Sequence, residues 1–170
     1  MKTILGLDIS TRCTGLCVLN DTLNCSYVRS DKEGLSIFDK ASLVRQELRR
    51  IKDAYGVTNI YIEQSVTRMG RGSSSAHTIN LLSRFNGIVS WIVYDTFGME
   101  PTFFDVRTAR KELGINIARG QDPKEMVMRH LIQNHKFSPE YSPAGKIYSW
   151  WYDMADAYVM ALYGKKLYGI

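Results

Sequence analysis

The chain has 170 residues, which is enough for one domain with a full hydrophobic core and too few for two such domains. Hydrophobic residues make up 45% and charged residues 23%, as in globular proteins, and no apolar run approaches the roughly 20 residues of a membrane span. We therefore expect a single domain over residues 1–170 with no membrane association. The net charge of +5 is modestly basic, which is compatible with nucleic acid as a partner but does not require one.

The N-terminus and the cysteines both favour a reducing cytosol. Asp8 interrupts the first apolar stretch and no cleavage site of small residues follows, so we expect no signal peptide. The three cysteines, Cys13, Cys17 and Cys25, are odd in number and fit no zinc spacing. We expect them to be buried free thiols, and we expect the protein to be cytoplasmic.

Residues 4–30 are expected to form three antiparallel strands. The first, ILGLD, ends on Asp8, the second resumes after Gly15, and the third alternates apolar and polar residues over 20–30. A single carboxylate at the end of a buried strand is costly unless a cation, a hydrogen-bond network or a metal accompanies it. The polar turn 10–14 is expected to line the cleft beside this carboxylate.

The next segment predicts a helix followed by a strand. Apolar residues recur at spacings of three and four over 33–55, and Gly56 is expected to end this helix as a left-handed cap. The run NIYIE that follows a helix is most simply a strand parallel to the first, and it ends on a second carboxylate, Glu63. Loop 64–75 is rich in Gly and Ser and contains Arg68 and Arg71.

The second half of the chain alternates helices with one strand. The pattern predicts a helix over 76–97, a strand over 101–106, a short helix over 107–113 and a loop that contains Arg119. Asp122-Pro123 is a helix start, since a capping acid precedes proline at the first helical position. The last helix, 153–167, begins with Asp153 and Asp156, which share one helical face.

Four acids thus stand at the ends of predicted elements: Asp8, Glu63, Asp153 and Asp156. Acids in the first turn of a helix can simply complement the helix dipole. Taken together, however, the four form an oxygen donor set that suits Mg²⁺. Two such ions about 4 Å apart can act on the attacking water and the leaving oxygen of a phosphodiester.

These segments resemble the RuvC family of Holliday-junction resolvases, within the RNase H-like superfamily. ILGLDISTRCTGLCVL resembles the first motif of the family, IYIEQ the second and DMADAYVMAL the last, in the same order and with similar spacing. The resemblance implies an RNase H-like α/β fold, with a five-stranded mixed sheet, the first three strands antiparallel, and helices on both faces. It also implies that Asp8, Glu63, Asp153 and Asp156 are catalytic metal ligands for two Mg²⁺ or Mn²⁺ ions per site.

The resemblance further implies a homodimer that cuts a four-way DNA junction by paired cleavage and leaves 5′-phosphate and 3′-hydroxyl ends, with no nucleotide cofactor. Family members use basic residues near the scissile phosphate, and the matching positions are Lys124, as a catalytic residue, and Arg107, where a lysine is usual. Where well-known members carry an aromatic three residues after the catalytic Glu, this chain has Val66, with Met69 nearby. The predicted DNA-binding residues are Val66, Met69 and Arg107 from these family positions, together with three loop arginines, Arg68, Arg71 and Arg119. The Gly- and Ser-rich loop of Arg68 and Arg71 is either a plain connection or a loop that binds the DNA backbone, since arginines bind phosphates.

Several alternatives remain open. Without the aromatic, selectivity for four-way junctions is in question, and phage members that cut several branched DNAs are a natural comparison, so an infected host cytoplasm or an organelle is a second possible location. A nuclease of the same fold that acts on other branched DNA or on structured RNA would share the opening motif. An actin-like ATPase also begins with an acid and a polar turn but needs a second domain, and a non-catalytic junction-binding module would not need all four acids.

Overall fold

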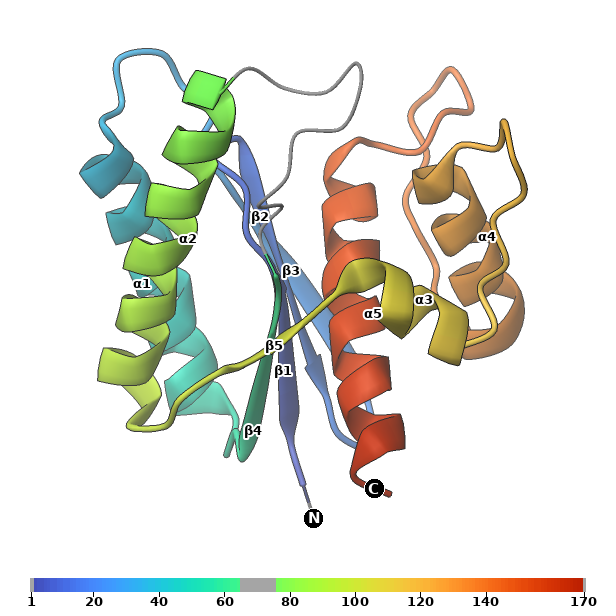
Figure 1. Ribbon diagram of the computed structural model, residues 1–170, viewed down its shortest axis with the longest axis horizontal. Helices are drawn as coiled ribbons and strands as arrows, with labels where there is room; N and C mark the ends of the chain where they lie inside the picture. The colour runs from blue at the N-terminus through green and yellow to red at the C-terminus, as the bar shows by residue number, and fades with distance from the viewer. Residues whose placement is uncertain (1, 65–75, 170) are drawn as a thin grey trace.

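A five-stranded mixed sheet forms the centre of the molecule, and the computed structural model describes residues 2–64 and 76–169 (Figure 1). The strands are β1 (Ile4–Asp8), β2 (Cys13–Leu19), β3 (Leu23–Arg29), β4 (Asn59–Glu63) and β5 (Thr102–Phe104). They lie in the order β3-β2-β1-β4-β5; the first three are antiparallel, and β4 and β5 run parallel to β1. The predicted five-stranded mixed sheet, with its first three strands antiparallel, is therefore confirmed.

Helices cover both faces of this sheet, as predicted. Figure 1 shows α1 and α2 on one face and α3, α4 and α5 on the other. Their bounds are α1 (Ile37–Ala54), α2 (Ala76–Phe97), α3 (Val106–Glu112), α4 (Pro123–His135) and α5 (Trp150–Leu167). Within the described residues, no helix combines the length and the apolar character that crossing a lipid bilayer requires.

The helix α1 is shorter than predicted at both ends. The helix begins at Ile37 because Ser36 and Asp39 form a capping box, in which each side chain binds the backbone N–H of the other. It ends at Ala54, and Tyr55 leaves it in an extended conformation. The prediction that Gly56 would serve as a left-handed cap was wrong, because the chain has already left the helix one residue earlier.

Two hydrophobic layers fix the helices to the sheet. Alternate residues of β1 and β2, among them Leu5 and Leu7, pack against α1 and α2. The other face of the sheet packs against α5, which is buried from Met154 to Gly164. Because α5 is buried on nearly all sides over this stretch, its sequence shows little amphipathic periodicity.

Two glycines let α5 lie directly on the sheet. A Cβ atom on Gly6 would overlap the backbone oxygen of Ala157, and one on Gly15 would overlap the backbone carbonyl of Asp153. Both positions therefore need a residue without a side chain. The close approach at Gly15 places the first turns of α5 over the end of β1.

The prediction of three free thiols was wrong for two of them. The structure contains a disulfide between Cys17 and Cys25, whose Cα atoms are 4.1 Å apart. The two residues lie directly opposite each other on β2 and β3, which brings their side chains together on one face of the sheet. Among the described residues, Cys13 is the one free thiol.

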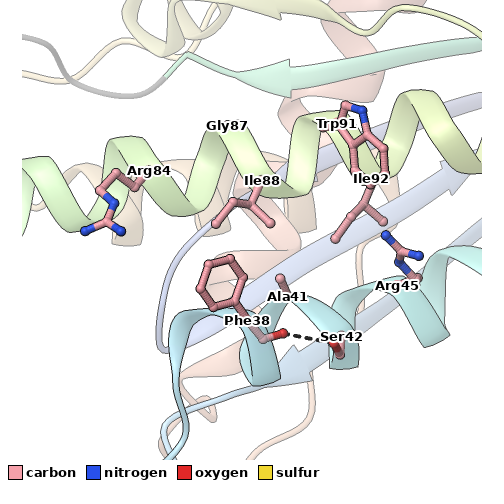
Figure 2. Close-up of a pocket in the computed structure, with 9 residues that line it drawn as sticks. All are labelled: Phe38, Ala41, Ser42, Arg45, Arg84, Gly87, Ile88, Trp91 and Ile92. Atoms are coloured by element: carbon pink, nitrogen blue, oxygen red, sulfur yellow. Dashed lines mark hydrogen bonds between the residues drawn. The ribbon is translucent and has the colours of Figure 1, made fainter.

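An apolar groove of about 620 Å³ lies between α1 and α2 (Figure 2). Phe38 and Ala41 of α1 face Ile88, Trp91 and Ile92 of α2 across it. Phe38 is 64% exposed and Trp91 57% exposed, so large apolar side chains remain uncovered here. Arg45 lies at the rim, with its guanidinium 5.6 Å from the centre of the Trp91 ring.

Candidate active site

The sheet brings Asp8 and Glu63 to neighbouring positions at one edge of the sheet, the edge formed by the carboxyl ends of β1 and β4. β1 and β4 are parallel, Leu7 pairs with Ile62, and the next residue on each strand is the acid. On the other side of β1, Asp8 pairs with Gly15 of β2. Both acids therefore lie at the carboxyl ends of adjacent parallel strands, where the sites of α/β proteins commonly form.

The first turns of α5 carry the other two acids to the same edge. Asp153 stands over Gly15, the partner of Asp8, because its backbone carbonyl packs on that glycine. Asp156 follows three residues later on the same helical face and is only 4% exposed. The structure thus brings together the four acids that the sequence analysis singled out.

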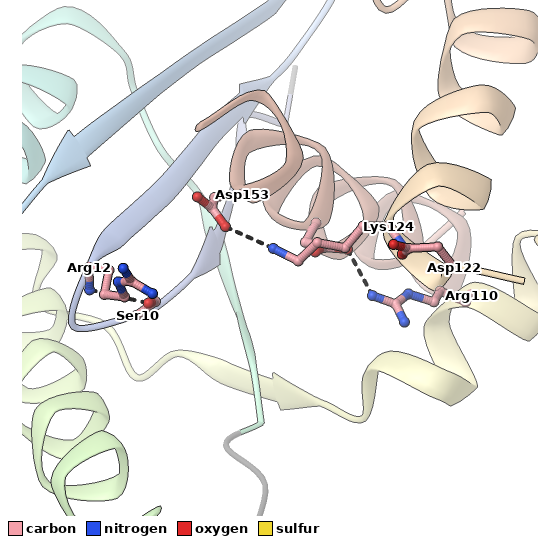
Figure 3. A network of polar contacts seen from close by, with 7 residues as sticks. Ser10, Arg12, Arg110, Asp122, Lys124 and Asp153 are labelled. Carbon is pink, nitrogen blue, oxygen red and sulfur yellow. Dashed lines mark hydrogen bonds and ion pairs between the residues drawn. The ribbon is translucent and has the colours of Figure 1, made fainter. Parts of the chain in front are cut away.

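Cations from the neighbouring helices hold the two acids of α5 (Figure 3). Lys124 Nζ donates to Asp153 Oδ1 at 3.0 Å, and Arg110 Nη2 donates to Asp156 Oδ1 at 2.9 Å. Asp122 places Lys124 by capping α4, since its side chain accepts from the Lys124 backbone N–H at 2.8 Å. Arg110 is largely buried, with 14% of its side chain exposed, and its Nε has no hydrogen-bond partner among the described residues.

Asp8 and Glu63 carry charge that is less well compensated. Burial raises the pKa of Asp8 well above its usual range, and repulsion from Glu63, Asp156 and Asp153 adds to this effect. Burial and the Asp156 carboxylate raise the pKa of Glu63 to about 7, although Arg110 and Lys124 act in the opposite direction. Within the described residues, neither acid has an ion-pair partner within 4.0 Å.

The donor set fits a hard divalent cation by its chemistry. Carboxylate oxygens are the ligands that Mg²⁺ and Mn²⁺ prefer, and a cation would offset the repulsion that raises the pKa of Asp8. Among the described residues, no three acidic, histidine or cysteine side chains are already arranged closely enough to enclose an ion. Lys124 and Arg110 are instead the cations that contact Asp153 and Asp156.

A pocket of about 430 Å³ opens beside these acids, between the β1–β2 turn and the start of α5. We call it the hairpin pocket, and its lining includes Ser10, Arg12, Arg29, Lys124, Trp150 and Asp153. The polar turn 10–14 therefore lines the cleft next to the candidate acids, as the sequence analysis expected. Cys13 also lines this pocket, and burial together with the Asp153 carboxylate raises the pKa of its thiol to about 12.

A second pocket, of about 390 Å³, lies between α3 and the start of α4. We call it the α3 pocket, and its lining includes Arg107, Arg110, Lys111, Ile115, Asn116 and Pro123. Through Arg110 it adjoins Asp156. Arg107, which was predicted to bind DNA, lines this pocket and is exposed.

The remaining predicted DNA-binding residues are not brought into the site by the described structure. Arg119 is exposed in the connection between α3 and α4. Val66, Arg68, Met69 and Arg71 lie outside the described residues.

Sequence reasoning missed Arg110 and Arg12. Helical spacing places Arg107, Arg110 and Lys111 on the same short helix, so a basic helix was visible in the sequence. Which of the three side chains meets an acid depends on how α3 is rotated against α5, and that rotation is set by packing. Arg12 lies in a turn that the sequence analysis assigned to the cleft without giving this residue a role.

The chain matches no protein-family model, and by sequence it matches no curated protein. Solved structures are similar to it over nearly its whole length. RuvC of T. thermophilus in complex with a Holliday junction substrate has a TM-score of 0.66 at 13% identity, over 96% of this chain and 92% of that chain. A second structure of Thermus thermophilus RuvC has a TM-score of 0.60 at 14% identity, over 95% of this chain and 91% of that chain.

The yeast mitochondrial Holliday junction resolvase Ydc2 is similar at a TM-score of 0.60 and 15% identity, over 95% of this chain and 77% of that chain. At such identities, structural similarity speaks for the architecture. It confirms at the level of the fold the resemblance that the sequence motifs indicated. With its β3-β2-β1-β4-β5 sheet and helices on both faces, the chain has the fold of RuvC, which is an RNase H-like fold.

Proposed function

We propose that the chain is a metal-dependent DNA endonuclease that resolves Holliday junctions by paired strand cleavage and leaves 5′-phosphate and 3′-hydroxyl ends. The observation that carries this proposal is the convergence of Asp8, Glu63, Asp153 and Asp156 at one edge of the sheet. This edge belongs to a fold shared with T. thermophilus RuvC, which has been solved with a Holliday junction substrate.

In this proposal the four carboxylates hold two Mg²⁺ or Mn²⁺ ions. When bound, the ions would supply Lewis-acid activation of a water molecule and of the scissile phosphate. Lys124, whose side chain is half exposed beside Asp153, would stabilise negative charge that develops on the phosphate. Arg110 orients Asp156 through the buried ion pair at 2.9 Å.

The proposal also covers the residues that contact DNA and the oligomeric state. Arg107 and Arg119 would contact the backbone of branched DNA, and Val66, Arg68, Met69 and Arg71 remain proposed contacts from their place in the sequence. The reaction needs no nucleotide cofactor, and we propose a cytoplasmic location. Paired cleavage needs two sites, so we propose a homodimer whose contact is the α1–α2 groove, where Phe38 and Trp91 expose a large apolar surface.

The substitution Asp8→Asn tests the site. With the full chain and Mg²⁺, we expect Asp8→Asn to retain binding to four-way DNA and to lose cleavage, because the amide keeps the shape of the side chain but loses its charge. Asp21→Asn, in the exposed turn between β2 and β3, is the matched control and should cleave like the unmodified chain. Full cleavage by Asp8→Asn would contradict the assignment of the site.

A panel of substrates tests the reaction. Matched four-way DNA, flap DNA and structured RNA should be incubated with the unmodified chain in Mg²⁺, in Mn²⁺ and in a chelator. We expect two symmetric cuts in four-way DNA, with ends that a ligase can rejoin, and no cutting in the chelator. Cleavage of RNA alone would reject the proposal in favour of an RNA-directed nuclease, and ATP hydrolysis without DNA cleavage would favour an ATPase.

A further inference from the structure

The hairpin pocket and the α3 pocket lie on opposite sides of the candidate acids. The hairpin pocket reaches the acids through Lys124 and Asp153, and the α3 pocket reaches them through Arg110, the partner of Asp156. Figure 3 shows Arg12 and Arg110 on opposite sides of Asp153. Cationic side chains therefore lie in both pockets and beside the acids between them.

One cation of the hairpin pocket forms no ion pair with a described residue, although its charge acts on Asp31, which also lines the pocket. Arg29 pairs with Asp31 at 2.8 Å, and Lys124 pairs with Asp153 at 3.0 Å. Arg12 is exposed, and its guanidinium has no ion-pair partner in the described part of the chain. An arginine in this position can bind a phosphate with two parallel hydrogen bonds without breaking an ion pair of the described residues.

Stacked aromatic rings stiffen the wall of this pocket. Trp150 lies between Tyr148 and Tyr27, with ring centres 4.5 Å and 5.3 Å from its own. The Arg29 guanidinium lies 5.8 Å from the centre of the Trp150 ring. Because the stack joins β3 to the start of α5, the wall of the pocket that contains Trp150 has a preformed shape.

The α3 pocket has a stronger excess of positive charge. Three cations line it, and no acidic side chain among the described residues does so. Arg110 is committed to Asp156. Arg107 and Lys111 are exposed and form no ion pair with any described residue, so both remain available to an anion from outside.

We infer that the two pockets hold backbone phosphates of the cleaved strand on opposite sides of the scissile bond, with Arg12 as the contact in the hairpin pocket and Lys111 as a contact in the α3 pocket. This inference rests on the proposed function and adds the path of the strand. The acids and the ions proposed to bind them act on the scissile phosphate, so the phosphates on both sides of it need cations of their own close by. Arg12 and Lys111 are cations in these two places, and neither forms an ion pair with a described acid.

The test combines side-chain and phosphate substitutions in the Asp8→Asn chain, which leaves the DNA intact. Arg12→Gln and Lys111→Gln each remove one charge, and Arg49→Gln, on the exposed side of α1, is the matched control. Four-way DNA is prepared with a single uncharged methylphosphonate on one or the other side of the scissile phosphate. Affinity is measured as fluorescence anisotropy over a range of salt concentrations, with circular dichroism to verify folding.

We expect Arg12→Gln and Lys111→Gln each to weaken binding roughly tenfold, as for a lost charge-assisted hydrogen bond. Each should also reduce the slope of log affinity against log salt by about 0.9, the value for one phosphate contact. A methylphosphonate on one side of the scissile phosphate should weaken DNA binding by the parent Asp8→Asn chain, but it should not weaken binding further once Arg12→Gln is present. A methylphosphonate on the other side should show the same loss of effect with Lys111→Gln. Arg49→Gln should leave both quantities unchanged.

Other outcomes would overturn the inference in distinguishable ways. If the parent chain binds four-way DNA but both variants keep its affinity and salt slope, the assignment of the pockets is wrong and the proposed function stands. If both variants couple to phosphates on the same side, the placement of the two pockets on opposite sides of the scissile bond is wrong. If the parent chain binds no branched DNA, or only RNA, the inference fails together with the proposed function.

Discussion

Asp8 and Glu63 differ from Asp153 and Asp156 in how their charge is compensated. The acids of α5 each have a cationic partner at hydrogen-bond distance, Lys124 for Asp153 and Arg110 for Asp156. Glu63 is partly buried and has no such partner among the described residues, and burial together with Asp156 raises its pKa to about 7. Within the described residues, the site is thus a pair of strand acids that form no ion pair beside a pair of helix acids that each form one.

The raised pKa of Glu63 predicts that the metal-free protein loses stability as pH rises. The folded state binds this proton more tightly than the unfolded chain does, so stability is full below about pH 4.5 and falls as pH rises to about 7. Glu63→Gln removes this loss, and in a chelator at pH 8 we expect it to be more stable than the unmodified chain by about 1–3 kcal/mol. Thermal unfolding at pH 5 and pH 8 measures the difference.

The control for this prediction is Glu33→Gln, in the exposed connection before α1. It should follow the pH dependence of the unmodified chain. Equal stability of Glu63→Gln and the unmodified chain at pH 8 would show that Glu63 carries no burial cost in the folded state.

At the scale of elements, the site depends on how α5 lies on the β1–β2 hairpin. Asp8 pairs with Gly15 across the ladder, and the backbone of Asp153 packs on Gly15. The strand register and the helix position are thus set at the same residue. A shift of α5 relative to this hairpin would separate the helix acids from the strand acids.

Gly15→Ala should disturb this arrangement without touching any acid. The added Cβ would overlap the backbone of Asp153 and Met154, which cannot yield as the end of a flexible side chain could. We expect a loss of stability of about 1–3 kcal/mol and a fall in cleavage rate of roughly tenfold or more, because small displacements of reacting groups are costly. Chemical denaturation and single-turnover cleavage of four-way DNA measure the two effects.

Gly56→Ala is the corresponding control, since a Cβ on Gly56 meets no atom within 4 Å. It should change neither stability nor cleavage by more than a small amount. A Gly15→Ala variant that behaved like the control would show that the position of α5 does not depend on this contact.

At the scale of the whole molecule, the two helical layers have different surfaces. The layer of α3, α4 and α5 contributes two cations next to the acids, Arg110 and Lys124. The layer of α1 and α2 lies on the opposite face of the sheet and exposes Phe38 and Trp91 at the groove. The division separates a charged surface suited to DNA from an apolar surface suited to another protein chain.

Trp91→Glu should therefore break the proposed homodimer. A charge in the apolar groove would be desolvated on association, so we expect the unmodified chain to be dimeric and the variant monomeric by light scattering. The variant should still bind branched DNA but should nick single strands instead of making paired cuts. Tyr141→Glu changes an aromatic that is equally exposed, at 57%, outside the groove, and it should remain dimeric. A dimeric Trp91→Glu chain would place the subunit contact elsewhere.

Much of the fold could be predicted from periodicity and from local stop signals. The apolar runs of β1, β2 and β4, the alternation of β3 and the helix of residues 76–97 all follow from apolar spacing, which reflects the geometry of a single element. The start of α4 follows from Asp122 and Pro123 for the same reason. The ends of α1 were misjudged because several residues could cap it, and the capping box at Ser36 and Asp39 was not recognised.

By itself, the sequence determined the elements of the fold, their order and the acids that stand at their ends, because these depend on residues close together in the chain. Only the tertiary structure decided which side chains meet. The disulfide between Cys17 and Cys25 depends on the register of β2 and β3, and the pairing of Arg110 with Asp156 depends on the rotation of α3 against α5. The position of Asp153 over Gly15, the ladder partner of Asp8, depends on a backbone contact between residues far apart in the chain. Contacts of this kind arise from packing between distant segments, which the spacing of residues in a single chain does not record.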